Sequence, residues 1–125
     1  MILIDSDVLI AHLRGQSEAR AWMVEARRRA GPLAISAVSV VEVAGGMRSR
    51  ERPEVERLFA SLRTFPVHER VAWRAAELMR SYRRSHSGIG LGDFLVAATA
   101  EIEGCELATL NVHHFPMFSG LQSPF

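Results

Sequence analysis

The sequence has 125 residues, of which 48% are hydrophobic and 23% charged, with a formal net charge of +1 and one cysteine. This length suits one domain with its own hydrophobic core, expected over residues 1–125. The near-zero charge offers no bulk attraction to nucleic acid, and one cysteine excludes an intramolecular disulfide framework. We expect a cytoplasmic protein without membrane contact, because no apolar run approaches ~20 residues and no secretory signal pattern is present.

Strand-like and helix-like patterns alternate along the chain, which predicts an α/β fold with a parallel sheet. Short apolar runs indicate strands, and apolar residues recurring every three or four positions indicate helices. The expected strands span 1–5, 33–35 and 106–109, with a short extended piece at 65–67. The expected helices span 7–13, 18–30, 39–48, 53–62, 69–85 and 93–103. The apolar C-terminal tail from Phe115 is expected to pack on the domain.

Two of the three aspartates follow the first apolar strand. Asp5 ends the run Ile2–Ile4, and Asp7 lies where the apolar pattern resumes as a helix. Asp7 is the better placed of the two to cap that helix, which leaves Asp5 without a capping role. Ligands in open α/β sheets bind at the carboxyl ends of the strands. Asp5 is therefore a candidate site residue.

Glu42 is an acidic residue inside an apolar segment. It lies within Val40–Ala44, so it is expected to face other protein, and Gly45 and Gly46 leave room beside it. The structural alternative is a capping box in which Ser39 and Glu42 satisfy each other's backbone at a helix start.

Asp93, the third aspartate, opens the most apolar helix of the chain. Its carboxylate is expected to point into a partly enclosed space. The alternative is again structural, because Asp7 and Asp93 both match the residue type that caps helix N-termini.

A cleft that gathered Asp5, Glu42 and Asp93 would bring like charges together. Two such charges ~4 Å apart repel by roughly 4 kcal/mol at an effective dielectric of 20. A cation among them would remove this repulsion, and all-oxygen sites suit Mg²⁺ or Mn²⁺. Such an ion activates water for phosphodiester hydrolysis, which makes a nuclease the expected function.

Four segments in this order resemble the PIN-domain family and, more narrowly, its VapC-type ribonuclease toxins. They are Ile4–Ile10, Ser39–Val43, Gly92–Ala100 and Thr109–Phe115. The resemblance covers the whole chain. It implies a three-layer α/β/α domain with a central, mainly parallel sheet, and an endoribonuclease that depends on Mg²⁺ or Mn²⁺.

The resemblance also implies residue roles. Asp5, Glu42 and Asp93 match the acidic metal-site positions, and Asp7 matches a neighbouring position. The fourth acidic position of the family falls within 109–115, where this chain has no carboxylate. Asn111 and His114 hold the candidate places there, with Asn111 as a ligand or as a residue that orients a metal-bound water. Ser6 and Thr109 are expected to hydrogen-bond the carboxylates.

Three partners follow from the same resemblance: an RNA substrate, a second copy of the chain in a homodimer, and a VapB-like antitoxin whose tail blocks the active-site groove. The candidate RNA contacts are basic residues near segment ends that border the expected cleft. They are Arg48, Arg50, Arg52, Arg83 and Arg84.

Two other functions also fit part of the pattern. Haloacid-dehalogenase-type phosphatases open with a strand followed by Asp-x-Asp, as in Asp5-Ser6-Asp7, but they need a lysine that this chain lacks. A PIN fold kept only to bind RNA or antitoxin would explain the missing fourth carboxylate.

Overall fold

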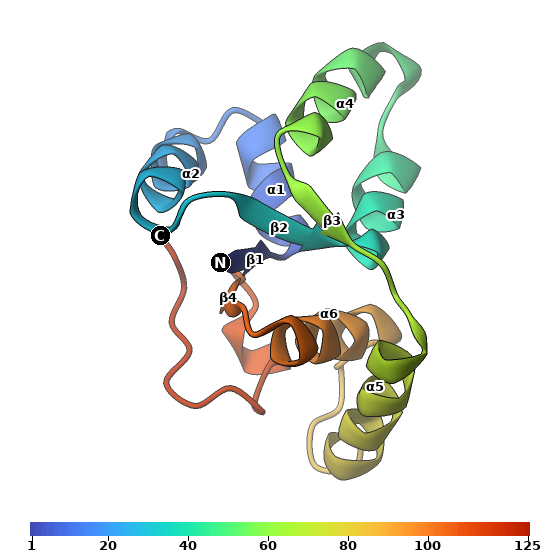
Figure 1. Cartoon of the computed structure of the whole chain (residues 1–125). Coiled ribbons are helices and arrows are strands. Elements are labelled where there is room, and N and C mark those ends of the chain that lie inside the picture. The colour runs from blue at the N-terminus through green and yellow to red at the C-terminus, as the bar shows by residue number, and fades with distance from the viewer.

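The computed structural model describes residues 1–125 and shows a three-layer α/β/α domain (Figure 1). Four parallel strands form the central sheet in the order β3-β2-β1-β4. The strands are β1 (Ile2–Ile4), β2 (Leu33–Ser36), β3 (Arg63–Phe65) and β4 (Glu106–Ala108). The helices are α1 (Ser6–Leu13), α2 (Ser17–Ala30), α3 (Ala37–Gly46), α4 (Arg52–Ala60), α5 (Glu69–Tyr82) and α6 (Leu91–Glu103), with 3₁₀ turns η1 (Ser49–Glu51) and η2 (Val112–His114). The expected α/β fold with a parallel sheet is confirmed.

The two faces of the sheet carry separate hydrophobic cores. Side chains alternate along a strand, so Ile2 and Ile4 of β1 pack with residues of α1 to α4, while Leu3 packs with α5 and α6. Figure 1 shows the corresponding layers, with α1 to α4 on one side of the sheet and α5 and α6 on the other. No helix is long and apolar enough to cross a membrane.

The carboxyl ends of the strands lie along one edge of the sheet, because all four strands run parallel. Asp5, Ser36 and Thr109 stand at or just beyond the ends of β1, β2 and β4, and all three are buried. The Asp5 N–H donates to the Ala108 carbonyl at 2.9 Å, which extends the pairing of β1 and β4 by one residue. This edge holds the candidate site.

The structure corrects the start of α3 and the span of β3. Helix α3 begins at Ala37 because Ser36 caps it, with the Ser36 hydroxyl accepting from the Val38 N–H at 3.2 Å. The capping box of Ser39 and Glu42 is therefore wrong, and Ser39 is buried within the helix. Strand β3 covers 63–65 rather than 65–67, since Pro66 has no N–H to donate to the sheet.

The positions of the aspartates at the helix starts also differ from those expected. Asp5 is the N-cap of α1, and its Oδ1 accepts from the Ser6 N–H at 2.9 Å. Asp7 is the second residue of the helix, within its first turn. Helix α6 begins at Leu91 after Gly90, so Asp93 is its third residue rather than its first. The prediction that Asp5 has no capping role was wrong.

The C-terminal tail packs on the domain as expected. Phe115 is fully buried in the core with α5 and α6, and the Phe118 ring centroid lies 6.4 Å from that of Phe115. The final residue, Phe125, is 37% exposed and stands 6.5 Å from Trp22 between ring centroids.

We predict that Phe115→Ala destabilises the protein far more than Phe125→Ala. Truncating a fully buried Phe costs about 3–5 kcal/mol of unfolding free energy, because a cavity remains in the core. The partly exposed Phe125 leaves no enclosed cavity, so its loss is expected below about 1 kcal/mol. Urea unfolding followed by circular dichroism measures both, and equal losses would contradict the packing described.

Candidate active site

Asp5 and Thr109 join the first strand to the last. The Thr109 hydroxyl lies 2.8 Å from Asp5 Oδ2, although the two residues are 104 positions apart. Thr109 is fully buried, and Asp5 is 5% exposed. The expected hydrogen bond from Thr109 to a site carboxylate is therefore present. Ser6 also supports Asp5, through its backbone N–H rather than its hydroxyl.

Asp7 lies next to the same hydroxyl but faces the segment after β4. Its Oδ2 accepts from the N–H of Leu110 at 3.0 Å and from the N–H of Asn111 at 3.1 Å. The Thr109 hydroxyl is 3.2 Å from that oxygen. Asp7 Oδ1 is buried without a hydrogen-bond partner. Asn111 itself is exposed, and its backbone rather than its side chain makes these contacts.

Asp93 meets His114 near the start of α6. His114 Nδ1 lies 3.2 Å from Asp93 Oδ2, and the Gly90 N–H donates to the same oxygen at 3.0 Å. Both side chains are about one-quarter exposed. The structure thus brings one of the two candidates for the fourth position, His114, onto a predicted metal-site carboxylate.

Glu42 projects from α3 toward the start of α6, where Gly92 makes room for it. A Cβ on Gly92 would lie 3.3 Å from Glu42 Oε2, so a larger residue would press on the carboxylate. Glu42 is more exposed than the sequence predicted. Partial burial nevertheless raises its pKa, and the charges of Asp93 and Asp7 raise it further, while a hydrogen bond from Ser6 opposes the shift.

The site carries excess negative charge. Burial raises the pKa of Asp5 from 3.8 to about 7, and the charges of Asp7 and Asp93 act in the same direction against the hydrogen bonds from Thr109 and Ser6. Burial raises the pKa of Asp7 as well. The charges of Asp5, Asp7, Glu42 and Asp93 are therefore close enough to disturb one another.

The donor chemistry fits a hard divalent cation. Asp5, Glu42 and Asp93 offer only oxygen atoms, and burial together with neighbouring negative charges raises the pKa of Asp5 and of Glu42. No three His, Cys, Asp or Glu side chains lie close enough together to surround one ion. The role of these three residues as joint ligands stays a prediction.

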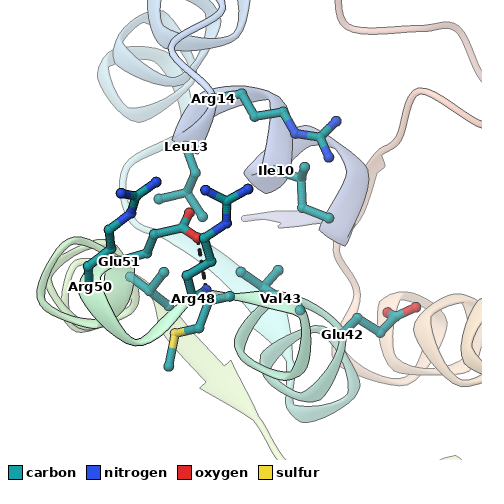
Figure 2. A pocket seen from close by; sticks show the side chains of 11 residues that line it. Ile10, Leu13, Arg14, Glu42, Val43, Arg48, Arg50 and Glu51 are labelled. Carbon is teal, nitrogen blue, oxygen red and sulfur yellow. Dashed lines mark hydrogen bonds between the residues drawn. The ribbon is translucent and has the colours of Figure 1, made fainter.

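A groove of about 500 Å³ runs from Glu42 between α1, α3 and α4 (Figure 2). Apolar side chains line it, namely Ile10, Leu13, Val43, Met47 and Val55. Three arginines, Arg14, Arg48 and Arg50, also border it. None of these three forms an ion pair within the chain.

The other candidate RNA contacts either lie away from the groove or already form an ion pair. Arg52 is paired with Glu56 at 2.6 Å. Arg83 and Arg84 are exposed just beyond α5 and do not line the groove. Sequence reasoning missed Arg14, which closes α1 beside the groove, and Gly92, whose missing side chain accommodates Glu42. The glycine next to Asp93 could have predicted this contact, because a glycine beside a site residue indicates that another group packs closely against the backbone there.

Comparisons with known proteins identify the family of the chain. A family model for the PIN domain matches residues 2–115. The chain belongs to the PIN-domain family. Ribonuclease VapC10 of Mycobacterium tuberculosis is 62% identical over 125 residues, covering 100% of this chain and 93% of the relative. Ribonuclease VapC19 of the same organism is 38% identical over 125 residues and covers 100% of both chains.

A solved toxin–antitoxin complex from Klebsiella pneumoniae contains a chain with the same fold. It superimposes with a TM-score of 0.82 at 24% identity, covering 100% of this chain and 98% of the other. With the two VapC relatives, these findings confirm the resemblance to VapC-type PIN domains. The haloacid-dehalogenase alternative is wrong, since Asp5-Ser6-Asp7 belongs to a PIN fold.

We predict that Asp5→Asn raises the melting temperature of the metal-free protein at pH 8. The Asp5 carboxyl titrates at about 7 in the folded chain against 3.8 when unfolded, so its ionisation destabilises the fold as pH rises between these values. The full effect corresponds to roughly 4 kcal/mol. Asparagine does not ionise, so it avoids this destabilisation, and it retains an oxygen that can accept from the Ser6 N–H.

Calorimetry in EDTA at pH 8 and pH 4 measures the effect. The advantage of the variant should shrink at the lower pH, where wild-type Asp5 is protonated in the folded chain and only partly ionised in the unfolded one. Glu106→Gln, at an exposed carboxylate on β4, serves as control. A variant that melts below wild type at pH 8 would mean that ionised Asp5 is net stabilising.

Proposed function

We propose that this chain is an endoribonuclease that depends on Mg²⁺ or Mn²⁺, with Asp5, Glu42 and Asp93 as the residues that hold the ion. The observation that carries the proposal is the buried carboxylate of Asp5, whose pKa is raised to about 7 beside two further aspartates. A cation at this edge of the sheet would turn that repulsion into attraction. The VapC relatives, named as ribonucleases, support the same reaction.

The chain's own groups have separate tasks in this reaction. Asp5 is held from two sides, by the Ser6 N–H and the Thr109 hydroxyl, which fixes its orientation. Glu42 and Asp93 approach from α3 and α6. His114, beside Asp93, is a supporting residue, and Asn111 offers an exposed amide at the end of the β4 segment. A bound divalent ion would supply an activated water and stabilise the phosphate oxygens.

We predict that the purified chain cleaves RNA in Mn²⁺ or Mg²⁺ and loses this activity in EDTA. Asp93→Asn is expected to reduce cleavage by at least about a hundredfold, as loss of a charged ligand costs several kcal/mol. It should also remove the rise in melting temperature that Mn²⁺ gives the wild type. Arg28→Gln, on the exposed face of α2, is the matched control.

The outcomes distinguish a ribonuclease from a PIN fold that only binds RNA or antitoxin. Manganese that stabilises the wild type while every tested RNA stays intact would favour a binding module that retains the metal site. Cleavage that survives both EDTA and Asp93→Asn would contradict the proposed mechanism.

We further propose that the RNA strand lies along the groove beside Glu42. Arg14, Arg48 and Arg50 are free of ion pairs and border the groove, so phosphates leaving the site would meet guanidinium groups without displacing a carboxylate. Arg52 is less suited because Glu56 occupies its guanidinium. Arg83 and Arg84 remain candidates for a more distant part of the strand.

We predict that Arg48→Gln and Arg50→Gln each weaken RNA binding and its dependence on salt. One lost phosphate contact lowers the slope of log K against log salt by about 0.7 for a single strand. Fluorescence anisotropy in an Asp93→Asn background measures binding without cleavage. Arg52→Gln is the matched control, and an equal loss there would show that the groove does not guide the strand.

We propose a VapB-like antitoxin as the protein partner. The toxin–antitoxin complex that shares this fold supports the assignment, as do the VapC relatives. The groove combines an apolar lining with three arginines, which outnumber its two carboxylates, Glu42 and Glu51, and this suits an amphipathic segment with acidic side chains. A tail in the groove would exclude RNA by occupying the same arginines. The homodimer stays a prediction, for which exposed Val41, Trp73 and Leu91 provide apolar surface.

A further inference from the structure

Asp7 lies in the candidate site but is not one of the three predicted metal ligands. Three donors converge on its Oδ2: the N–H groups of Leu110 and Asn111, at 3.0 and 3.1 Å, and the Thr109 hydroxyl at 3.2 Å. Helix α1 thus holds a segment more than 100 residues away in the sequence. Helix capping, the expected structural role of Asp7, belongs to Asp5 instead.

The segment after β4 has few other anchors. The N–H groups of Leu110 and Asn111 donate to no backbone carbonyl. Asn111 N–H has one second acceptor, the Thr109 hydroxyl oxygen at 3.1 Å. Beyond it, the backbone turns at once into η2, where the Asn111 carbonyl accepts from the His114 N–H at 2.9 Å. The position of Asn111 and the start of η2 therefore depends on side-chain acceptors.

Thr109 connects this segment to Asp5. Its single hydroxyl proton faces Asp5 Oδ2 at 2.8 Å and Asp7 Oδ2 at 3.2 Å, so the shorter contact, to Asp5, is the stronger one. Its oxygen accepts from Asn111. Asp5, Thr109 and Asp7 form one hydrogen-bonded unit between the two sides of the site.

We propose that Asp7 is a positioning residue: its Oδ2 fixes the backbone of Leu110 and Asn111, and thereby sets where Asn111 and His114 stand relative to Asp5 and Asp93. This inference rests on the proposed ribonuclease function. Asp7 Oδ2 already accepts up to three hydrogen bonds, so a metal ion bound to this oxygen would compete with them. Holding reacting groups in place through supporting hydrogen bonds is how active sites maintain productive geometry.

Hydrogen exchange of the ¹⁵N-labelled, metal-free chain tests the contact itself. Asp7→Ala is expected to speed exchange of the Leu110 and Asn111 amides by roughly ten- to a hundredfold, the range for hydrogen bonds to charged acceptors. Amides within α5, on the far side of the sheet, should be unchanged. Unchanged exchange at Leu110 and Asn111 would overturn the proposal.

Two further variants keep the test decisive if Asp7→Ala does not fold. Asp7→Asn retains an acceptor but loses the charge, so a smaller acceleration, about three- to tenfold, is expected at both amides. Thr109→Val removes the hydroxyl but leaves Asp7, so Leu110 should stay protected. Loss of protection at Leu110 in Thr109→Val, with none in Asp7→Asn, would assign the anchoring to Thr109 instead.

Metal affinity distinguishes positioning from ligation. Titration calorimetry with Mn²⁺ alone should show binding to Asp7→Asn within about tenfold of wild type and none to Asp5→Asn, because only a ligand is indispensable. Equal loss in both variants would make Asp7 a ligand and overturn the proposal.

Kinetics provide the last readout. In Asp7→Ala, kcat for RNA cleavage is expected to fall at least about tenfold with KM little changed, since positioning acts on the reacting geometry. Asp7→Asn should recover part of that loss. A change in KM alone would point to RNA binding and contradict positioning. An inactive wild type would refute the proposed function, while the exchange data would still decide the contact.

Discussion

The hydrogen bond between Thr109 and Asp5 links the last strand of the sheet to the first, and the rest of the site depends on it. Both residues are buried at the carboxyl edge, where backbone ladders end and polar groups need side-chain partners. The parallel order β3-β2-β1-β4 places β1 beside β4, so a residue near the N-terminus meets one more than 100 positions later. Asp7, in the first turn of α1, contacts Leu110 and Asn111 as a result of the same strand order.

The buried, ionisable carboxyl of Asp5 lowers the stability of the fold and is explained by a functional role. A buried carboxyl whose pKa lies at about 7 weakens the fold whenever it is ionised, and the neighbouring charges of Asp7 and Asp93 add to the effect. A sequence selected for stability alone would place Asn or Ser at this edge. Retention of three aspartates and Glu42 in one neighbourhood instead matches the behaviour of functional sites, where shifted pKa values and unsatisfied polar atoms such as Asp7 Oδ1 gather.

The resemblance to the PIN family grouped Asp5, Glu42 and Asp93 as metal residues, and this grouping stays a prediction. Sequence patterns predicted the sheet and most helices, because apolar periodicity is a local signal. They failed where two neighbours offered the same chemistry. Asp5 and Asp7 both match an N-cap, and only the position of β4 decides which one remains for long-range contacts. Ser36 and Ser39 posed the same problem for α3. The ion pair of Arg52 with Glu56 could be predicted from their spacing of four residues on a helix. The position of Arg14 beside the groove could not, because the groove forms only when the helices pack.

The site has two halves that are held with different firmness. Asp5, Asp7 and Thr109 form a hydrogen-bonded half in which Asp5 and Thr109 are buried. In the other half, Glu42 is exposed and Asp93 contacts Gly90 and His114 near the surface. This division explains why charges interact across the site although no three ligands surround one point. Asp5 cannot move without breaking the β1–β4 junction, because its N–H donates to the Ala108 carbonyl there. The buried half therefore defines the geometry to which Glu42 and Asp93 contribute from α3 and α6.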